Sequence, residues 1–457
     1  MELITAGAKG VAIGKTEEGK TVLVGYAVPG DVVNVQVIKS KKKYYEAKVV
    51  DFIKYSPDRE VPECIHFGIC GGCKWQNLSY EKQLEYKEKE VYNNIKRIGK
   101  IENFQQLSIV PSSDKYYYRN KMEFSFSNAR WLTSEEIQSE TNIIDKKALG
   151  FHIPQQWNKV LDIKECFLQQ EPSNKIRNSI KEFAIKHKLE FYDFKEKNGF
   201  LRTLMIRSNS KNDLMVLLQF FREEEQNIKK LLNYIREQFS EVKTILYVIN
   251  SKGNDSLHDL DVKTFHGNGF LMEEIGDLKF KIGPKSFFQT NYKQAVKLYE
   301  IARDFAGLNG DEVVYDLYTG TGTIAQFIST NAKKVIGVEA VPEAIKAAKE
   351  NAEYNNIKNC RFYCGDMKDI FTEEFIYENG HPDIIITDPP REGMHKNVVE
   401  TILRIAPGKI VYVSCNSATQ ARDLELMKEK YEIKKVQAVD MFPQTYHVES
   451  VALLKLK

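Results

Sequence analysis

The chain has no long apolar run and no strong charge of one sign. No stretch approaches the roughly 18 uninterrupted apolar residues that a membrane-spanning helix needs. The amino terminus, MELITAGAKG, lacks the charged, apolar, small-residue order of a secretory signal. A formal net charge of +3 is far from the strongly basic balance of a simple nucleic-acid binder. We therefore expect a soluble, cytoplasmic protein with no membrane partner.

The cysteines do not form a pattern typical of secreted proteins. There are seven, an odd number, which argues against a framework of paired disulfides. They fall into an early group, one isolated position and a late group: Cys64, Cys70 and Cys73, then Cys166, then Cys360, Cys364 and Cys415. Metal binding or thiolate chemistry fits this distribution better than disulfide bonding.

The excess positive charge lies at the beginning of the chain. Residues 1–55 hold nine Lys against six Asp or Glu, which accounts for the whole net charge of +3. Basic side chains that alternate with aromatic ones suit contact with phosphates and stacking on bases. A solvated hairpin tip is the alternative interpretation. The residues concerned are Lys39, Lys41, Lys42, Lys43, Tyr44 and Tyr45.

A length of 457 residues predicts two or three domains, and the pattern of the sequence changes twice. Residues 1–57 alternate in short strand-like runs separated by turns, which predicts a small OB-like β-barrel. Residues 58–275 open with the cysteine group and a polar helix, then give mixed signals that predict an α+β domain. Residues 276–457 alternate apolar strands with helices, which predicts an α/β, Rossmann-like, doubly wound sheet.

The predicted strands of the last segment end in residues suited to a nucleoside cofactor. The turn Asp316–Gly322 contains glycines that let the backbone approach a ligand closely. Glu339 follows the next strand, where a carboxylate can accept the ribose hydroxyls, and Asp366 follows the third, where it can meet the adenine amino group. Each of these acids could be a turn or cap residue. Taken as an ordered set, without Gly-x-Gly-x-x-Gly, they predict S-adenosylmethionine rather than a dinucleotide.

A rigid turn follows the fourth predicted strand. Two prolines hold the carboxylate of Asp388 at the mouth of the cofactor site with little conformational freedom. In amino-group methyltransferases the corresponding turn ends in an aromatic residue that stacks on the target base. Arg391 stands there in this sequence, which argues against methylation of nitrogen.

Cys415 is the candidate nucleophile. Carbon 5 of uracil becomes reactive toward a sulfonium methyl group when a thiolate adds at carbon 6, and a base must later remove the proton from carbon 5. Cys415 follows an apolar strand and precedes a polar run, which is a poor position for a structural core cysteine. Glu449 and His447 share one face of a predicted carboxyl-terminal strand, and the chemistry alone allows either as the base.

At these residues the sequence closely resembles the RNA uracil-5-methyltransferase family, bacterial enzymes that make 5-methyluridine in ribosomal or transfer RNA. The motifs of the family stand here as Phe287–Asn291, Asp316–Tyr318, Glu339, Asp388–Arg391, Ser414–Asn416 and His447–Glu449. The resemblance implies that Cys415 is the nucleophile and Glu449 the base. It also implies cofactor contacts from Gln289, Tyr318, Glu339, Asp366 and Asp388. Tyr118–Lys121 resembles a segment near the target nucleotide, or is an ordinary strand edge.

The first two segments resemble one branch of that family. Residues 1–57 are similar to the TRAM domain, an RNA-binding barrel, and Cys64, Cys70, Cys73 and Cys166 match the ligands of an iron-sulfur cluster. Spacing alone does not separate a 4Fe-4S cluster from zinc, and the resemblance favours iron. Related enzymes pack the helix at 80–99 on the catalytic domain.

The resemblance also implies a substrate and an assembly state. It implies 23S ribosomal RNA as the partner, with transfer RNA as an alternative, and a monomer. Cys360 and Cys364 match no motif of the family and are expected in the core. Two rival functions remain: a catalytically silent RNA-binding or ribosome-assembly protein, and an amino-group methyltransferase, which would leave Cys415 unexplained.

Overall fold

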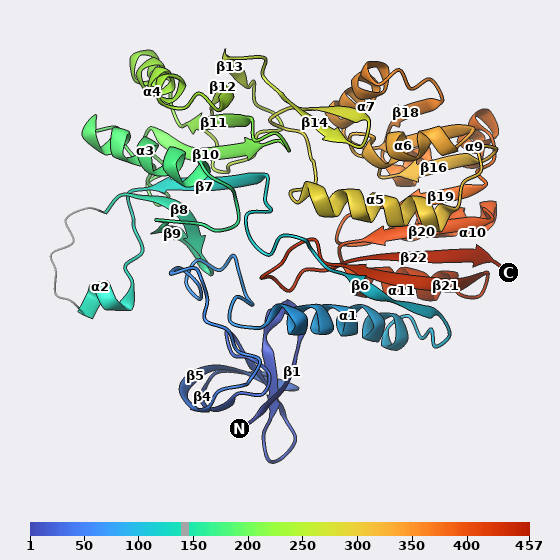
Figure 1. Ribbon diagram of the computed structural model, residues 1–457, viewed down its shortest axis with the longest axis horizontal. Helices are drawn as coiled ribbons and strands as arrows, with labels where there is room; N and C mark the ends of the chain where they lie inside the picture. The colour runs from blue at the N-terminus through green and yellow to red at the C-terminus, as the bar shows by residue number, and fades with distance from the viewer. Residues whose placement is uncertain (139–145) are drawn as a thin grey trace.

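The structure, a computed structural model, describes residues 1–138 and 146–457 and contains three large sheets (Figure 1). A five-stranded sheet stands at one end of the molecule, a seven-stranded sheet lies above it, and an eight-stranded sheet lies to the side. A small hairpin joins the two larger sheets; its strands are β14 (Leu271–Ile275) and β15 (Leu278–Ile282). Within the described ranges, no helix is both long enough and apolar enough to cross a membrane.

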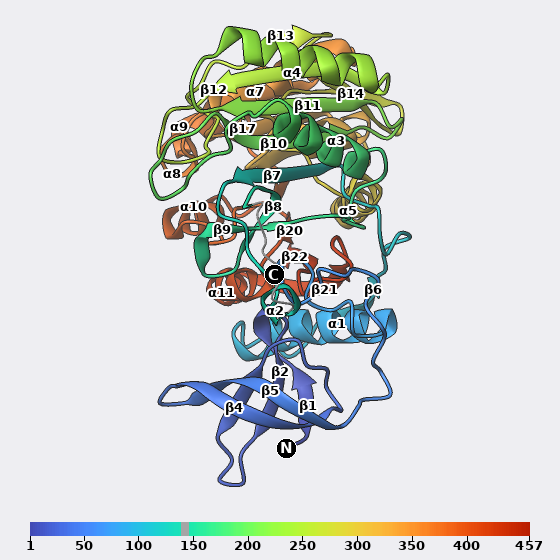
Figure 2. The same ribbon diagram turned by 90° about the vertical axis from the view of Figure 1, so that its left-hand side faces the viewer.

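The amino-terminal sheet is built from short strands around a small apolar core. Its order is β1 (Leu3–Ala6), β2 (Ala12–Lys15), β3 (Thr21–Val24), β5 (Tyr44–Lys54) and β4 (Val32–Ser40). Leu3, Val22, Val24 and Val33 are buried together. One bridge between Glu2 and Val32 joins the two outer strands, but among residues 1–57 no continuous ladder closes the predicted barrel. The β4–β5 hairpin projects from this sheet (Figure 2).

The central sheet carries two helices on one face. Its order is β13 (Lys263–His266), β12 (Val242–Ile249), β11 (Leu214–Phe220), β10 (Leu201–Ser208), β7 (Lys121–Ser127), β8 (Ala148–Ile153) and β9 (Gln156–Asp162). All residues of β11 are buried, as expected for a continuous apolar run in the middle of a sheet. α3 (Ser173–Lys186) and α4 (Glu225–Gln238) cover the sheet and share its core.

The eight-stranded sheet has the predicted Rossmann-like topology. Its order is β18 (Cys360–Cys364), β17 (Lys334–Glu339), β16 (Val313–Leu317), β19 (Ile384–Thr387), β20 (Lys409–Ser414), β22 (Glu449–Leu456), β21 (Tyr431–Val439) and β6 (Gln105–Val110). The strands from β18 to β20 are parallel, and β22 is antiparallel to both of its neighbours.

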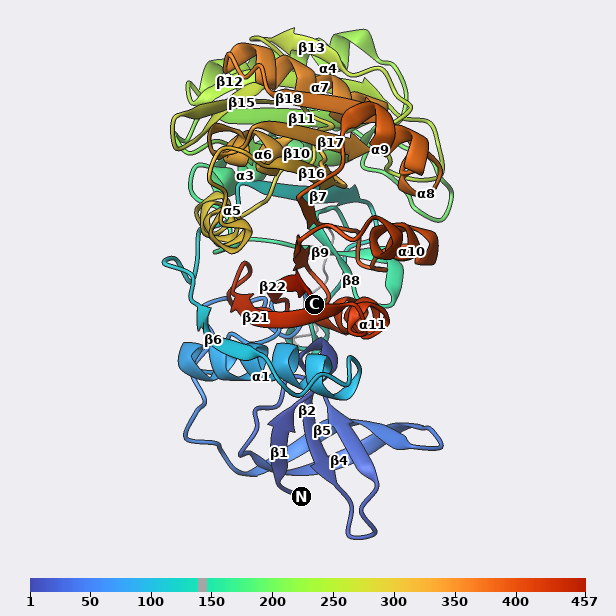
Figure 3. The same ribbon diagram turned by 90° about the vertical axis from the view of Figure 1, so that its right-hand side faces the viewer.

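Helices cover both faces of this sheet, as expected for a parallel sheet whose strands are apolar on both sides. One face packs against α5 (Tyr292–Ala306), α6 (Thr323–Ile328) and α7 (Pro342–Tyr354). The other face packs against α1 (Tyr80–Arg97), α8 (Met367–Ile370), α9 (Glu373–Asn379), α10 (Lys396–Ile405) and α11 (Ser417–Met427). Figure 3 shows α1, α10 and α11 around the β21–β22 end of the sheet.

The segment predicted as one central unit, residues 58–275, is divided in space. The apolar stripe of α1 buries Val91 and Ile95 in the same core as Leu424 and Met427 of the carboxyl-terminal unit. β6 then extends the large sheet by pairing in parallel with β21. The packing of α1 agrees with the expectation that the helix at 80–99 lies on the catalytic domain, whereas the pairing of β6 was not expected; an amphipathic helix is stable wherever it buries its apolar face, and sequence order does not fix that place.

The carboxyl-terminal strand is shorter than predicted. β22 begins at Glu449, and residues 440–448 form an irregular loop between β21 and β22, named here the 440–448 loop. Gln444 in this loop has a φ of 66°, which a strand does not allow. His447 therefore lies in the loop rather than on a strand face shared with Glu449.

Candidate active site

The strand ends of the large sheet bring the predicted nucleophile and base together. β20 and β22 are antiparallel, and Ser414 pairs with Ser450. The next residues outward, Cys415 and Glu449, therefore lie opposite each other at the end of this strand pair. β16, β17 and β19 run parallel to β20, so their carboxyl ends meet at the same edge.

Hydrogen bonds join the Asp388–Arg391 turn to the segment that carries Cys415. The carbonyl oxygen of Arg391 accepts from Nδ2 of Asn416 at 2.9 Å and from Oγ1 of Thr419 at 3.1 Å. Asn416 also caps α11 by accepting from the backbone of Ala418. The first residues of α11, which follow Cys415, thus hold the Asp388–Arg391 turn in place.

Burial and like charge shape the acidity of these groups. Burial, with Glu449 and Asp388 nearby, raises the pKa of the Cys415 thiol to about 11, although Arg391 opposes the rise. Burial raises the pKa of Asp388 to about 6. Burial, with Asp388 nearby, raises the pKa of Glu449 to about 8. Cys415, Asp388, Arg391 and Glu449 therefore form one electrostatic group, the kind of arrangement that clusters at functional sites.

The pKa of Glu449 lies above that of His447, which is the reverse of the usual order for a carboxyl and an imidazole. Burial, helped by Arg391, Lys87 and Arg119, lowers the pKa of His447 to about 4. The imidazole lies against the rings of Phe442 and Tyr446. With Glu449 at about 8, the carboxylate is the stronger base of the two.

The first strand end presents a tight, glycine-containing turn. The buried carboxylate of Asp316 accepts from Oγ1 of Thr319 at 2.5 Å and from the backbone of Ala325 at 3.1 Å. Burial raises its pKa to about 7. Gly322 has a φ of 74°, and a β-carbon there would lie 2.8 Å from the ring of Phe362, so glycine is required.

Tyr318 and Glu339 border this turn. Tyr318 adopts a φ of 64°, and burial raises the pKa of its hydroxyl to about 12. The carboxylate of Glu339 at the end of β17 accepts from the backbone nitrogens of Gly320 (3.2 Å), Ala340 (2.8 Å) and Val341 (3.0 Å). It is thereby held at the glycine turn, as the predicted ribose contact requires.

Asp366 and Gln289 are the remaining two residues that the sequence predicts as cofactor contacts. Asp366 is exposed, caps α8 and forms an ion pair with Lys368 at 3.1 Å, and this partner lowers the pKa of its carboxyl. Gln289 lies between β15 and α5, and its carbonyl accepts from Nδ2 of Asn120 at 3.0 Å. Asn120 also donates its backbone N–H to Thr290. The Tyr118–Lys121 segment therefore contacts the Phe287–Asn291 segment.

Tyr299 is a further site residue that the sequence patterns did not single out. It is buried on α5, and the pKa of its hydroxyl is raised by burial and by Asp388, Asp316 and Glu449 nearby. In the sequence it is one member of an apolar helix face, so its polar end could not be distinguished from ordinary core packing.

The four early cysteines are neighbours without disulfide bonds. All are free thiols. Burial raises the pKa of Cys64 to about 11 and of Cys73 to about 12, and charge on Cys70 or Cys166 would raise both further. Nevertheless, the described residues contain no group of three or more His, Cys, Asp or Glu side chains arranged to hold a metal ion. The donor chemistry fits iron or zinc, whereas the predicted cluster stays a prediction.

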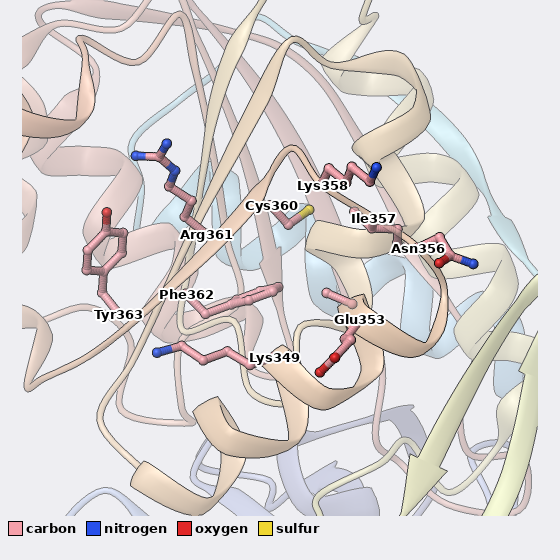
Figure 4. Close-up of a pocket in the computed structure, with 10 residues that line it drawn as sticks. Lys349, Glu353, Asn356, Ile357, Lys358, Cys360, Arg361, Phe362 and Tyr363 are labelled. Carbon is pink, nitrogen blue, oxygen red and sulfur yellow. The ribbon is translucent and has the colours of Figure 1, made fainter.

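The late cysteines Cys360 and Cys364 lie on the edge strand β18. Cys360 is half-buried and packs against the core of the large sheet, whereas Cys364 is exposed, so the expectation of a core cysteine was wrong for Cys364; an edge strand buries only part of its surface. Cys360 borders a hollow of about 590 Å³ between α7 and β18 (Figure 4). Its other lining residues include Lys349, Glu353 and Arg361, and none of the strand-end groups above.

Comparisons with known proteins agree with this geometry. The family model for tRNA (uracil-5-)-methyltransferase matches residues 79–457, and the TRAM domain model matches residues 5–50. An uncharacterized RNA methyltransferase of Bacteroides thetaiotaomicron is 52% identical over 98% of this chain and 100% of its own, and one of Porphyromonas gingivalis is 48% identical over 99% of each.

A solved structure extends the likeness to the whole molecule. Pyrococcus abyssi tRNA (uracil-54, C5)-methyltransferase, in complex with S-adenosyl-L-homocysteine, superimposes with a TM-score of 0.77 at 28% identity, covering 99% of both chains. The resemblance found in the sequence and the expectation of S-adenosylmethionine are thus confirmed. The chain belongs to the tRNA (uracil-5-)-methyltransferase family of S-adenosylmethionine-dependent RNA methyltransferases and carries an amino-terminal TRAM domain.

Proposed function

We propose that the protein methylates carbon 5 of a uridine in 23S ribosomal RNA, with Cys415 as a covalent nucleophile and Glu449 as the base. The observation that carries the mechanism is the register of β20 and β22, which sets Cys415 opposite Glu449 beside Asp388 and Arg391. A binding protein has no need for a thiol and two carboxyls gathered at a cofactor edge.

In this mechanism the thiolate of Cys415 adds to carbon 6 of the uracil, and the electrons of the 5,6 double bond move to carbon 5 and oxygen 4. S-adenosylmethionine, when bound, would supply the methyl group to carbon 5 by cleavage of its sulfonium–methyl bond, which leaves S-adenosylhomocysteine. Glu449 accepts the proton from carbon 5, the double bond forms again, and the sulfur of Cys415 leaves carbon 6. Arg391 favours the thiolate because it opposes the rise of the Cys415 pKa.

The residues proposed to hold the cofactor are Gln289, Tyr318, Glu339, Asp366 and Asp388. Glu339 and the glycine turn suit the ribose, and Tyr318 offers a half-buried aromatic face beside them. Asp316 supports the turn from beneath through Thr319 and Ala325.

Mass spectrometry of RNA tests substrate and mechanism together. Unmodified 23S and transfer RNA would each be incubated with the protein and labelled S-adenosylmethionine, then digested and mapped. Methyl gain at one uridine of 23S RNA is the expected result. Cys415→Ala should abolish the gain while calorimetry shows unchanged cofactor binding; methylation by Cys415→Ala would overturn the covalent mechanism.

Transfer RNA is the second candidate substrate. It is favoured by the solved relative, whose name gives uracil 54 of tRNA as its target and which matches this chain over 99% of its length. Methyl gain only in transfer RNA would keep the chemistry and replace the substrate. Gain in neither RNA, with cofactor bound, would support the silent RNA-binding alternative.

We also propose that Cys64, Cys70, Cys73 and Cys166 hold a 4Fe-4S cluster with a structural role. Four free, neighbouring thiols in one domain support this, and the buried guanidinium of Arg177 lies close enough to Cys166 to offset negative charge. Protein purified without oxygen should contain about four iron and four sulfide per chain, as expected for this cluster type. One zinc per chain and no sulfide would overturn the iron assignment.

A further inference from the structure

The 440–448 loop, which leads directly into Glu449, is held by a buried ion pair from α1. The Lys87 ammonium lies 2.6 Å from the Asp440 carboxylate, and both side chains are fully buried. Tyr80 donates its hydroxyl to the other carboxylate oxygen at 2.8 Å. Lys87 also donates to the carbonyl oxygen of Phe442 at 3.1 Å. Three contacts from one helix therefore fix the first residues of the loop.

A second contact from α1 fixes the middle of the loop. Gln83 and Gln444 bond reciprocally: Nε2 of Gln83 donates to Oε1 of Gln444 at 3.0 Å, and the backbone N–H of Gln444 donates to Oε1 of Gln83 at 2.9 Å. Nε2 of Gln83 also donates to the carbonyls of Trp75 and Leu78. Gln83 is thus the point where α1, the segment before it and the loop meet.

The same loop touches the amino-terminal sheet. The carbonyl oxygen of Gln444 accepts from the backbone nitrogens of Lys74 (2.8 Å) and Trp75 (3.1 Å). The Trp75 indole donates to the carbonyl of Gly10 at 3.2 Å, and Tyr446 packs in one cluster with Trp75 and Val28. The 440–448 loop and the segment around Trp75 thus connect the amino-terminal sheet to β22, the strand that carries Glu449.

Other contacts hold the loop from the opposite side. Tyr118 of the central unit donates to the carbonyl of Pro443 at 3.0 Å. Asn291, which caps α5, donates to the carbonyl of Met441 at 3.0 Å, and Gln294 of α5 donates to the carbonyl of Asp440 at 2.9 Å. Apolar contacts would stabilise such a loop equally well, whereas a buried ion pair and an amide pair permit one geometry.

We propose that Tyr80, Gln83 and Lys87 are positioning residues that set Glu449 for proton removal and make this step depend on docking of the amino-terminal segment. The inference rests on the proposed role of Glu449 as base. Its consequence is specific: loosening the loop slows release of the methylated RNA from Cys415 more than it slows methyl transfer, since only release needs the base.

The test compares Gln83→Met, which keeps length and loses the amide, with the milder Tyr80→Phe. Gln437→Ala is the matched control, because Gln437 lies on β21 and bonds the Ser108 carbonyl of β6, away from the loop. Single-turnover experiments on the full chain with labelled RNA would measure methyl transfer and, on denaturing gels, the covalent protein–RNA adduct. Melting temperature and calorimetric cofactor binding would check the fold.

Gln83→Met should slow adduct release about tenfold or more, a loss typical of a misplaced catalytic group. Methyl transfer should change little, so adduct accumulates; Gln437→Ala should accumulate none. Equal slowing of both steps without adduct overturns the inference, and if Gln83→Met does not fold, Tyr80→Phe decides. Glu449→Gln is measured in the same experiment. If Glu449→Gln traps no adduct, the assignment of Glu449 as the base fails. If Glu449→Gln traps adduct but Gln83→Met and Tyr80→Phe do not, only the positioning role is rejected.

Discussion

Cys415 lies among acidic groups, so its reactivity depends on whichever positive charges are near. Its pKa of about 11 leaves little thiolate near neutral pH, and Arg391 lowers that pKa. At the proposed cofactor site, a bound sulfonium would add a second positive charge beside Asp388 and Glu449. In the proposed mechanism the cofactor would thus supply positive charge as well as a methyl group.

Alkylation by iodoacetamide should show this effect. Cys415 is expected to react slowly at pH 7 and faster as the pH rises toward 11, because only the thiolate reacts. S-adenosylmethionine should accelerate the reaction relative to S-adenosylhomocysteine, which lacks the positive sulfur, and Arg391→Leu should slow it. Peptide mass spectrometry measures the rate, with exposed Cys364 as internal reference. Equal rates with both cofactor forms would contradict the argument.

The raised pKa of Glu449 predicts that the stability of the folded protein depends on pH. Its folded pKa of about 8 lies above the ordinary 4.5, so folding disfavours the charged form, and the native protein loses stability as pH rises from about 4.5 to 8. Glu449→Gln removes this cost, on the order of a few kcal/mol above pH 8. Its melting temperature should match the native value near pH 4.5 and exceed it increasingly up to pH 8. Exposed Glu429→Gln is the control and should show no such trend.

At the scale of elements, the sequence predicted those strands and strand ends that are defined by the local pattern of apolar and polar residues. The parallel strands and the acids at their ends are visible because buried strands read as apolar runs that stop at polar residues. The addition of β6 to the sheet and the contacts between α1 and the 440–448 loop were not predictable, since they join segments more than 300 residues apart. Gln83, Lys87 and Asp440 carry no motif, and their roles arise only from tertiary contact.

The placement of α1 on the large sheet makes a prediction about stability. Ile95 is fully buried against the core that contains Leu424 and Met427, so Ile95→Ala should destabilise the carboxyl-terminal unit by about 3 kcal/mol. Denaturant unfolding followed by hydrogen exchange would measure it. Exposed Asn93 on the same helix supplies the control, Asn93→Ala, which should stay within about 0.5 kcal/mol. If Ile95→Ala reduced protection from hydrogen exchange only in the central sheet, the packing of α1 on the large sheet would be contradicted.

At the scale of the molecule, the residues proposed for RNA affinity and those proposed for the chemistry lie on different surfaces. The basic tip Lys41–Lys43 stands on the β4–β5 hairpin, on the far side of α1 from the large sheet (Figures 1 and 2). Electrostatic contact with phosphates depends on salt, whereas the covalent steps proposed at Cys415 do not.

Replacing Lys41, Lys42 and Lys43 together with Ala should therefore weaken RNA binding and leave single-turnover methyl transfer at saturating RNA unchanged. If the three side chains contact phosphates, the slope of log affinity against log salt should fall by about two. Filter binding over a salt series measures the slope, and Lys15→Ala, Lys54→Ala and Lys100→Ala together give a control of equal charge. An unchanged slope would favour the solvated-tip interpretation.

The position of β22 in the large sheet has a consequence for synthesis. β22, the last strand of the chain, lies between β20 and β21, while α1 and β6, made more than 300 residues earlier, pack on β21. As the protein emerges from the ribosome, the amino-terminal and central units can fold while α1 still exposes its apolar stripe and β6 has no partner. The eight-stranded sheet is complete only once β22 has been made, so Glu449 takes its place later in synthesis than α1 and β6 become available.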